Sequence, residues 1–194
     1  AYNALLNHLH FYPILNHTYG AANKTDGTAL TTFKATASMP EKFLRTVEAA
    51  ITHSRTDKNN PRRGPYDLVI GSNDIFTMER ALNRVSQQGF DLQSSALGLI
   101  QNVIVYDGWS GTRGKKETSY TGVNQSKAYL VHKGNRDEDF RSMVKQSLDI
   151  AMGNPDVSRF IEAQMVWDTY FGVYANPTAG VEEITLPAAN SGAA

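Results

Sequence analysis

Three histidines near the start of the chain could bind a metal ion. His8, His10 and His17 lie close together in the sequence, and imidazole nitrogens are common zinc ligands. No carboxylate lies among them, and the chain has no cysteine that could complete a zinc site. Surface histidines also cluster by chance. We therefore predict no metal site.

Three aspartates could serve as catalytic acids. Asp67, Asp74 and Asp107 lie near the ends of predicted strands, where the acids of α/β enzymes often lie. The same residue type is common in turns and helix caps, and we favour that role. Glu162 and Asp168 share a face of one long predicted strand, but about 20 Å of strand separates them, too far for a carboxylate pair.

A glycine-rich stretch that begins at Gly108 could bind phosphate, because Lys115 follows Gly114 as in a phosphate-binding loop. That motif also needs glycine five positions before Gly114, where Trp109 stands, and Ser or Thr after the lysine, where Lys116 stands. We favour a mobile polar loop. His53 and His132 have no neighbouring nucleophile arrangement. The sequence thus predicts no catalytic residue and no cofactor.

Composition describes a soluble folded chain. Among 194 residues, 19 are basic and 19 acidic, 41% are hydrophobic and 20% are charged. A net charge of zero argues against a dedicated nucleic-acid binder. No apolar run is long enough to span a membrane, and no signal peptide is visible. Because the chain begins at Ala1, we expect it to be processed or part of something longer.

Two helices have clear signals. Residues 38–41 form a capping box with Pro40 in the first turn, and a helix is predicted over 39–53 with an apolar face at Phe43, Leu44, Val47 and Ile51. A second helix is predicted over 73–88, ended by Gly89. Its expected apolar face is Ile75, Phe76, Leu82 and Val85.

Short apolar runs predict a small mixed sheet between these helices. The runs are 67–71, 99–106 and 127–132. Two polar loops separate the elements, 54–65 with a local charge of about +3 and 107–125 with four glycines. Residues 1–37 are expected to be irregular.

The last third of the chain predicts a long antiparallel hairpin. From Arg159 to Tyr174 apolar and polar residues alternate with period two, which is typical of a half-buried strand. Residues 147–152 alternate in the same way, so the hairpin is expected over about 146–174. A short helix starting near Phe140 remains an alternative. One more strand is predicted from Val181 to Leu186, and the tail after Pro187 is expected to fray.

The sequence contains the phrases PYDLVIGSNDIFTMERAL, LIQNVIVYDGW, KAYLVHKGN and WDTYFGVYANPTAGVEEITL. With these phrases, the order of the elements resembles that of the major capsid proteins of tailed bacteriophages, whose fold encapsulin shells share. The resemblance covers roughly residues 38–187. It implies an α+β fold, with an axial domain of mixed sheet flanked by helices and a peripheral domain with a long β-hairpin. The N-terminal arm, extended loop and spine helix of that family have no visible counterpart in residues 1–37.

The resemblance divides the chain into an irregular N-terminal segment (1–37), an axial-type domain (38–136), a peripheral-type hairpin with the closing strand (137–187) and a frayed tail (188–194). It implies a structural, non-enzymatic capsid subunit that forms pentamers and hexamers of itself in an icosahedral shell. That shell would enclose DNA without sequence-specific contact, alongside other head proteins, in virions assembled in the host cytoplasm. Long polar loops and the absence of a catalytic constellation independently favour an assembly component. The candidate subunit-contact residues are Arg62, Arg63, Trp109, Arg113, Lys115 and Lys116.

Two alternatives remain. One is a small α/β enzyme or ligand-binding domain that uses Asp67, Asp74 and Asp107, with the loop of residues 108–122 as a lid. It requires one deep pocket that joins these carboxylates. The other is an encapsulin-like shell that encloses protein cargo and has the same fold.

Overall fold

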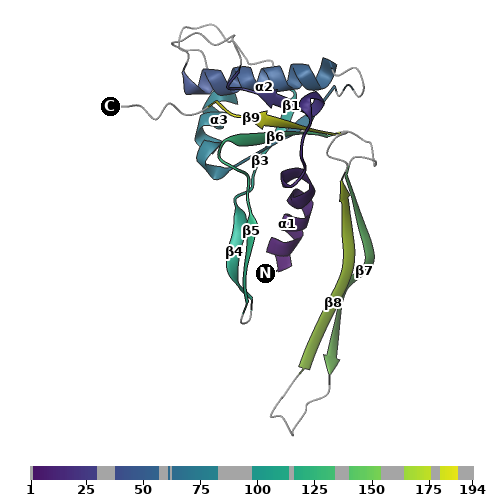
Figure 1. Cartoon of the computed structure of the whole chain (residues 1–194). Coiled ribbons are helices and arrows are strands. Elements are labelled where there is room, and N and C mark those ends of the chain that lie inside the picture. Colours follow the sequence, from purple (N-terminus) through teal and green to yellow (C-terminus); the bar gives the residue numbers. More distant parts are fainter. Residues whose placement is uncertain are drawn as a thin grey trace, which may run out of the picture. The chain divides into compact units, whose positions relative to one another are not determined.

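The computed structural model describes residues 2–29, 38–56, 61, 63–82, 98–113, 116–133, 140–153, 164–175 and 180–187 (Figure 1). The chain forms two compact units. Unit 1 combines Ala1–Asn135 with Asn176–Ala194, and unit 2 is Arg136–Ala175.

Unit 1 is built on a five-stranded mixed sheet. In spatial order its strands are β1 (Lys24–Asp26), β9 (Val181–Thr185), β6 (Lys127–His132), β2 (Tyr66–Ile70) and β3 (Ile100–Val105). The pairs β1–β9 and β2–β3 are parallel, whereas β9–β6 and β6–β2 are antiparallel. The predicted mixed sheet is therefore confirmed. The closing strand β9, which the predicted domain division grouped with the peripheral hairpin, forms its ladder with β6 inside unit 1. The division into axial and peripheral domains stays a prediction.

Helix α2 (Met39–Thr56) begins and packs as the sequence predicts. The Lys42 N–H donates to the Ser38 carbonyl over 2.9 Å, so the first turn closes directly after Ser38. Phe43, Val47 and Ile51 are buried on one face. The helix continues one turn past His53, where the prediction ended it.

A short 3₁₀ turn (η2, Ser72–Asp74) leads into α3 (Ile75–Leu82), whose Met78 and Leu82 are buried. Phe76 is 70% exposed, so its predicted place on the buried face was wrong. Helical spacing links Ile75, Met78 and Leu82 along one stripe and leaves Phe76 on its flank. The rest of this predicted helix, with Val85 and Gly89, lies outside the described residues.

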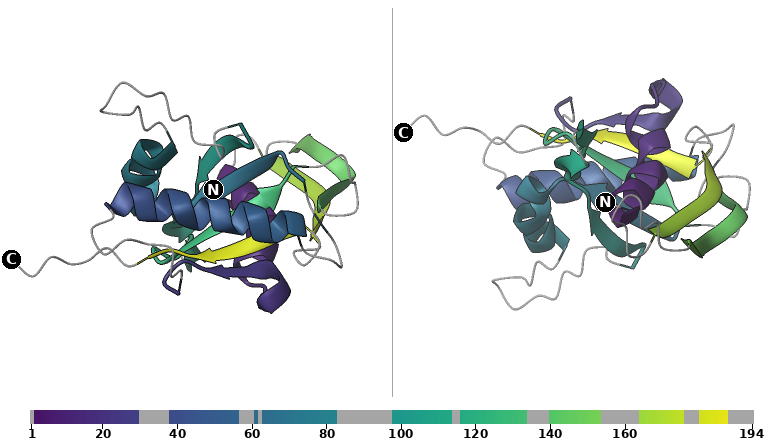
Figure 2. Two further views of the ribbon diagram at one scale, coloured as in Figure 1. Left: turned by 90° about the horizontal axis from the view of Figure 1, so that it is seen from above. Right: turned by 90° about the horizontal axis from the view of Figure 1, so that it is seen from below.

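Helices cover both faces of the sheet. Viewed from above, α2 lies in front of the sheet, and viewed from below, α1 (Tyr2–Leu15) does (Figure 2). On the α1 side, Ile14 and Tyr19 are buried, and the Tyr19 ring lies 5.9 Å from that of Tyr129 on β6. On the α2 side, the core joins α2 and α3 to the sheet. Its members are Phe43, Val47, Ala50, Ile51, Tyr66, Leu68, Ile70, Met78, Ala81, Leu82, Ala128, Leu130, Ile184 and Leu186.

The expectation of an irregular segment at residues 1–37 was wrong where α1 forms. Apolar residues in this segment are spread around the helix axis, so the periodic signal is weak, and Pro13 lies inside the helix. After it come a short 3₁₀ turn (η1, Ala21–Asn23) and β1. Among the described residues, no helix combines the length and apolar character that a membrane crossing needs.

The predicted polar loop of residues 107–125 was also wrong, because β4 (Gly108–Arg113) and β5 (Lys116–Thr121) form an antiparallel hairpin. Its glycines permit close backbone approach. Gly108 has φ +77°, and a Cβ there would lie 2.0 Å from the Tyr120 carbonyl oxygen. A Cβ at Gly122 would lie 2.1 Å from the Asp107 carbonyl carbon. Glycine at these two positions therefore allows the backbones to approach closely and does not indicate a mobile loop.

Unit 2 contains the long hairpin, β7 (Phe140–Gly153) paired antiparallel with β8 (Gln164–Ala175). This confirms the predicted hairpin. A strand rather than the alternative helix starts at Phe140.

Two substitutions on α3 test which side of this helix is buried. Met78→Ala removes a fully buried side chain and should lower the free energy of unfolding by about 2–4 kcal/mol, because it leaves a cavity. Phe76→Ala removes an exposed ring and should change it by less than about 0.5 kcal/mol. Urea unfolding followed by circular dichroism measures both. Equal losses would contradict the packing of α3 described above.

Candidate functional site

The three predicted acids lie at separate places. Asp67 is at the start of β2, where its Oδ1 accepts a hydrogen bond from the Asn102 side-chain amide over 2.8 Å. Asp107 follows β3, and its Oδ1 accepts the Ser72 N–H over 2.7 Å. Because β2 and β3 run parallel, the start of one and the end of the other lie at opposite edges of the sheet. The capping role predicted for Asp107 is confirmed by its bond to the start of η2.

Asp74 does not join either of them. Its Oδ2 is buried without a hydrogen-bond partner in the described part of the chain, and burial raises the pKa of this carboxyl group. A depression of about 540 Å³ lies at the carboxyl ends of β2 and β3 and includes Asp107 but neither of the other two acids. Its lining residues are Gly71, Ser72, Asn73, Asp107, Thr121, Gly122, Val123, Asn124 and Gln125. The single deep pocket that the enzyme alternative requires is not formed by the residues described.

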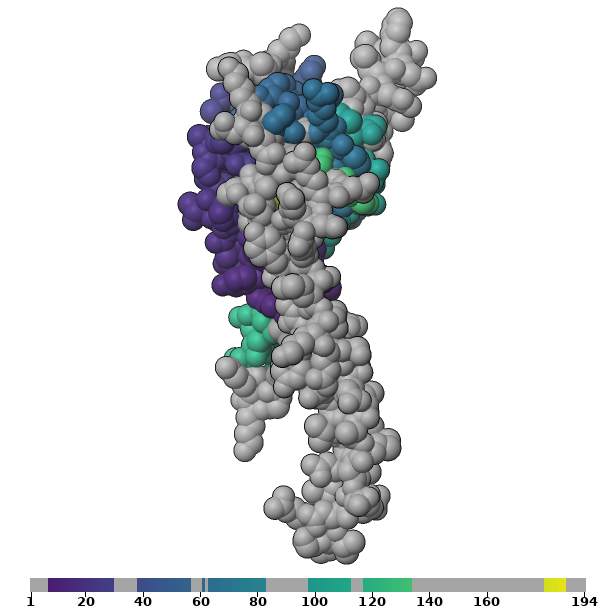
Figure 3. Space-filling model, turned by 90° about the vertical axis from the view of Figure 1, so that its right-hand side faces the viewer, coloured from purple at the N-terminus to yellow at the C-terminus, as the bar shows by residue number. Residues whose placement is uncertain are grey.

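The N-terminal histidines are not gathered into a metal site. Within the described ranges, no group of three or more His, Asp and Glu residues could hold a metal ion. His8 instead stacks on Tyr120 of β5, with ring centroids 4.1 Å apart, and burial lowers its pKa. Phe11 stacks on Tyr106 at 4.3 Å. The first contact fixes α1 against the β4–β5 hairpin and the second against the segment between β3 and β4. Helix α1 and the hairpin lie side by side in the space-filling view (Figure 3).

The candidate subunit-contact residues lie in different environments. Trp109 is half-buried, 5.8 Å from the Tyr120 ring, and lies across Gly111, where a Cβ would come within 2.4 Å of its indole. Arg63 is exposed just before β2. Arg113 and Lys116 are paired in the backbone register as the last pair of the β4–β5 ladder. Arg62 and Lys115 lie outside the described residues. Contact with another subunit remains a prediction for all six.

Two neighbouring buried carboxylates on β9 were missed by the sequence analysis. Glu182 and Glu183 are 3% and 4% exposed. Consecutive residues of a strand point to opposite faces of the sheet, so one carboxylate lies on the α2 side and the other on the α1 side. The only sequence signal was a pair of acids inside an apolar strand, which also fits an exposed strand.

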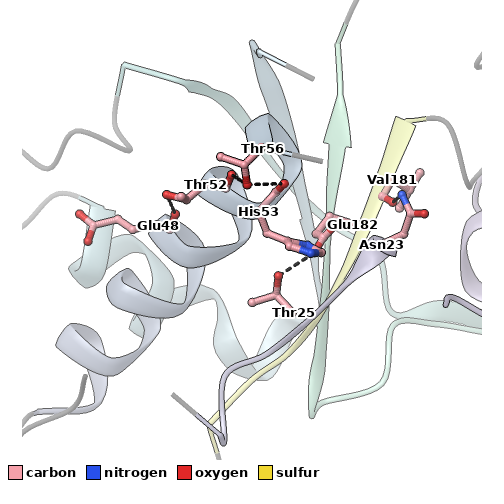
Figure 4. Close-up of polar contacts among 8 residues, drawn as sticks. All are labelled: Asn23, Thr25, Glu48, Thr52, His53, Thr56, Val181 and Glu182. Carbon is pink, nitrogen blue, oxygen red and sulfur yellow. Dashed lines mark hydrogen bonds and ion pairs between the residues drawn. The ribbon is translucent and has the colours of Figure 1, made fainter. Parts of the chain in front are cut away.

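Glu182 joins α2 to two strands (Figure 4). Its Oε1 accepts the Thr25 hydroxyl of β1 over 2.6 Å and lies 2.6 Å from His53 Nδ1 of α2. A histidine that activates a hydroxyl must contact it directly. Here Thr25 and His53 instead meet the same carboxylate oxygen. The arrangement is therefore suited to holding α2 on the sheet rather than to nucleophilic catalysis.

Glu183 forms comparable contacts on the α1 side of the sheet. Its carboxylate lies 3.3 Å from Lys24 Nζ of β1 and 2.7 Å from Lys127 Nζ of β6, so it bridges the strands on both sides of β9. Burial, with a smaller contribution from the nearby Glu183 charge, raises the pKa of Tyr129 to about 12.

Removing the Glu182 carboxylate should destabilise the chain. Glu182→Ala leaves the buried Thr25 hydroxyl and the partly exposed His53 ring without this acceptor, and we expect a loss of about 1–3 kcal/mol. The matched control is Glu48→Ala on α2, which removes the exposed pair with Arg45 and should cost less than about 1 kcal/mol. Urea unfolding compares the two, and equal effects would contradict a stabilising role for Glu182.

The raised Tyr129 pKa predicts alkaline destabilisation. The unfolded chain loses this proton near pH 10 and the folded chain near pH 12. The stability linked to this group is therefore present below pH 10 and is lost as the pH rises towards 12. Tyr129→Phe should make the free energy of unfolding fall less steeply across this interval. An unchanged slope would show that Tyr129 is not the group responsible.

No protein-family model and no curated protein matches the sequence. Solved structures do match. The virus-like particle from Pyrococcus furiosus is similar with a TM-score of 0.54 and 15% identity, over 94% of this chain and 63% of that one. A phage-related protein from Bordetella bronchiseptica RB50 is similar with a TM-score of 0.50 and 12% identity, over 88% of this chain and 58% of that one.

The capsid of cyanophage P-SCSP1u gives a TM-score of 0.48 and 15% identity, over 87% of this chain and 53% of that one. This chain thus spans about three fifths of the length of the first two proteins. Together with the mixed sheet, its flanking helices and the long hairpin, the likenesses to the first two of these proteins show that the chain has the capsid-like α+β fold implied by the sequence resemblance.

Proposed function

We propose that this chain is a structural subunit that assembles with copies of itself into a closed shell. The observation that carries the proposal is the likeness to the virus-like particle protein over 94% of the chain. The separation of Asp67, Asp74 and Asp107 supports a structural rather than an enzymatic role, because the pocket found among the described residues contains only Asp107.

More specifically, we propose that the chain is a capsid subunit of a tailed phage. Pentamers and hexamers would form an icosahedral shell in the virion, after assembly in the host cytoplasm and with other head proteins as further partners. Equal numbers of basic and acidic residues favour enclosure of DNA over tight binding, since tight binding needs a basic excess.

The end of the β4–β5 hairpin supports a contact between subunits. Arg113 and Lys116 form its last pair, and like charges directly opposite each other destabilise an isolated hairpin. An acidic group on a neighbouring subunit would relieve this repulsion. We therefore assign this end of the hairpin to a subunit border.

Electron microscopy of the purified full-length protein, with its mass from light scattering, tests the shell. The expected result is closed particles made of many copies. A monomer at every concentration, without particles, would overturn the proposal. Nuclease-protected DNA inside the particles would support the phage form, whereas enclosed protein would support the encapsulin-like alternative.

A charge reversal tests the hairpin contact. Arg113→Glu combined with Lys116→Glu keeps a like-charged pair in the hairpin and changes only the sign that a neighbour meets. Particle yield should fall by about tenfold or more, because like charges across an interface cost several kcal/mol. Arg45→Glu, at an exposed position on α2, should leave the yield unchanged. Normal yield from the double variant would exclude the contact.

A further inference from the structure

The β4–β5 hairpin has one half-buried face and one exposed face. Residues along a strand point alternately to the two faces. The half-buried face contains the cross-strand pair Trp109–Tyr120 and the pair Gly111–Thr118 beside it. Exposed residues of the other face are Ser110, Thr112, Glu117 and Ser119. A two-stranded hairpin is only marginally stable alone in water, so the half-buried face needs another element to pack against it.

Helix α1 packs against this face of the hairpin. The His8 ring stacks on Tyr120 with centroids 4.1 Å apart and planes at 12°, and its Nδ1 lies 3.5 Å from the Tyr106 hydroxyl oxygen. Tyr12, on the same helix, meets the His8 ring edge-on at 5.3 Å. The Tyr120 ring in turn lies 5.8 Å from Trp109. A chain of aromatic contacts therefore joins α1 to both strands of the hairpin.

The remainder of α1 is anchored on the five-stranded sheet. Phe11, three residues after His8 and on the same side of the helix, stacks at 4.3 Å on Tyr106, which directly follows β3. Near the end of the helix, Ile14 is 5% exposed, and its carbonyl accepts the Tyr19 hydroxyl over 2.9 Å. Successive turns of one helix thus contact the hairpin first and the sheet next.

The base of the hairpin restricts its direction only weakly. The hairpin and the five-stranded sheet have separate ladders, and the chain passes between them through Gly108 and Gly122. Gly108 has φ +77°, and glycine tolerates a wider range of backbone angles than any other residue. Small residues at such junctions often absorb the backbone changes of a hinge. Contacts beyond the base must therefore select the direction of the hairpin.

We propose that α1 is a splint that sets the direction of the β4–β5 hairpin through the stack of His8 on Tyr120. While the stack is made, the hairpin is held alongside α1 (Figure 1). When it is lost, the hairpin turns at its glycine base and its ladder opens more often. For its functional consequence this inference rests on the proposed function, which assigns the hairpin end to a subunit border. Docking of α1 then decides whether that border is in position for assembly.

Hydrogen exchange of the unassembled protein tests the splint without any particle. His8→Ala should raise amide exchange in residues 109–113 and 116–121 by about fivefold, the expected effect of losing one aromatic stack. His8→Phe keeps a ring on Tyr120 and should restore the slow exchange. His10→Ala, at an exposed position of the same helix, is the matched control and should leave the exchange of the hairpin unchanged.

The distribution of the change along the chain is decisive. A rise confined to the hairpin, with β2 and β6 still protected, is the expected result. Unchanged exchange of the hairpin in His8→Ala would overturn the splint. A rise that extends equally to β2 and β6, or loss of the fold by circular dichroism, would also overturn it, because α1 would then support all of unit 1.

Particle yield tests the functional consequence separately. Measured by electron microscopy and light scattering, the yield should fall by about fivefold in His8→Ala, in step with the opening of the hairpin, and return in His8→Phe. Faster exchange of the hairpin with normal yield would leave the splint standing and overturn the assignment of the hairpin end to a border. Wild-type protein that forms no particles would overturn the shell, and hydrogen exchange would still decide the splint.

Discussion

The placement of β9 between β1 and β6 is the contact on which the rest of unit 1 depends. β9 supplies the ladder for β1 on one side and for β6 on the other. It also carries Glu182, which holds α2 through His53, and Glu183, which bridges Lys24 and Lys127. A buried carboxylate is costly unless its charge is compensated. Each of these two finds its partners only when β1, β6 and α2 are in place, so they favour this one arrangement over other registers.

Elements with a strong local period could be predicted from the sequence. The apolar stripe of α2 comes from packing on one face and the continuous apolar run of β2 from burial on both, so each signal lies within a few residues. The alternation of residue types in β8 is equally local. The capsid-like fold followed from the order of these elements. Contacts between copies of the chain have no local period, and for that reason the candidate contact residues remain predictions.

The features that the sequence analysis did not predict depend on contacts between residues far apart in the sequence. α1 is stabilised by Phe11 and His8 stacking on Tyr106 and Tyr120, and these contacts leave no periodic stripe. The glycines of the β4–β5 hairpin suggested mobility, but close backbone approach is what requires them. Glu182 gave no signal of its buried contact because Thr25, its partner, lies 157 residues away.

The same separation has a consequence for synthesis of the protein on the ribosome. The chain emerges from its N-terminus, so Lys24–Asp26 are available long before Val181–Thr185 exist. Until then β6 has an open edge and β1 has no neighbouring strand. Of the five strands in this sheet, β9 is therefore made last, and it is the one that completes the sheet. The order of the strands along the chain thus delays completion of the sheet until Val181–Thr185 have been made.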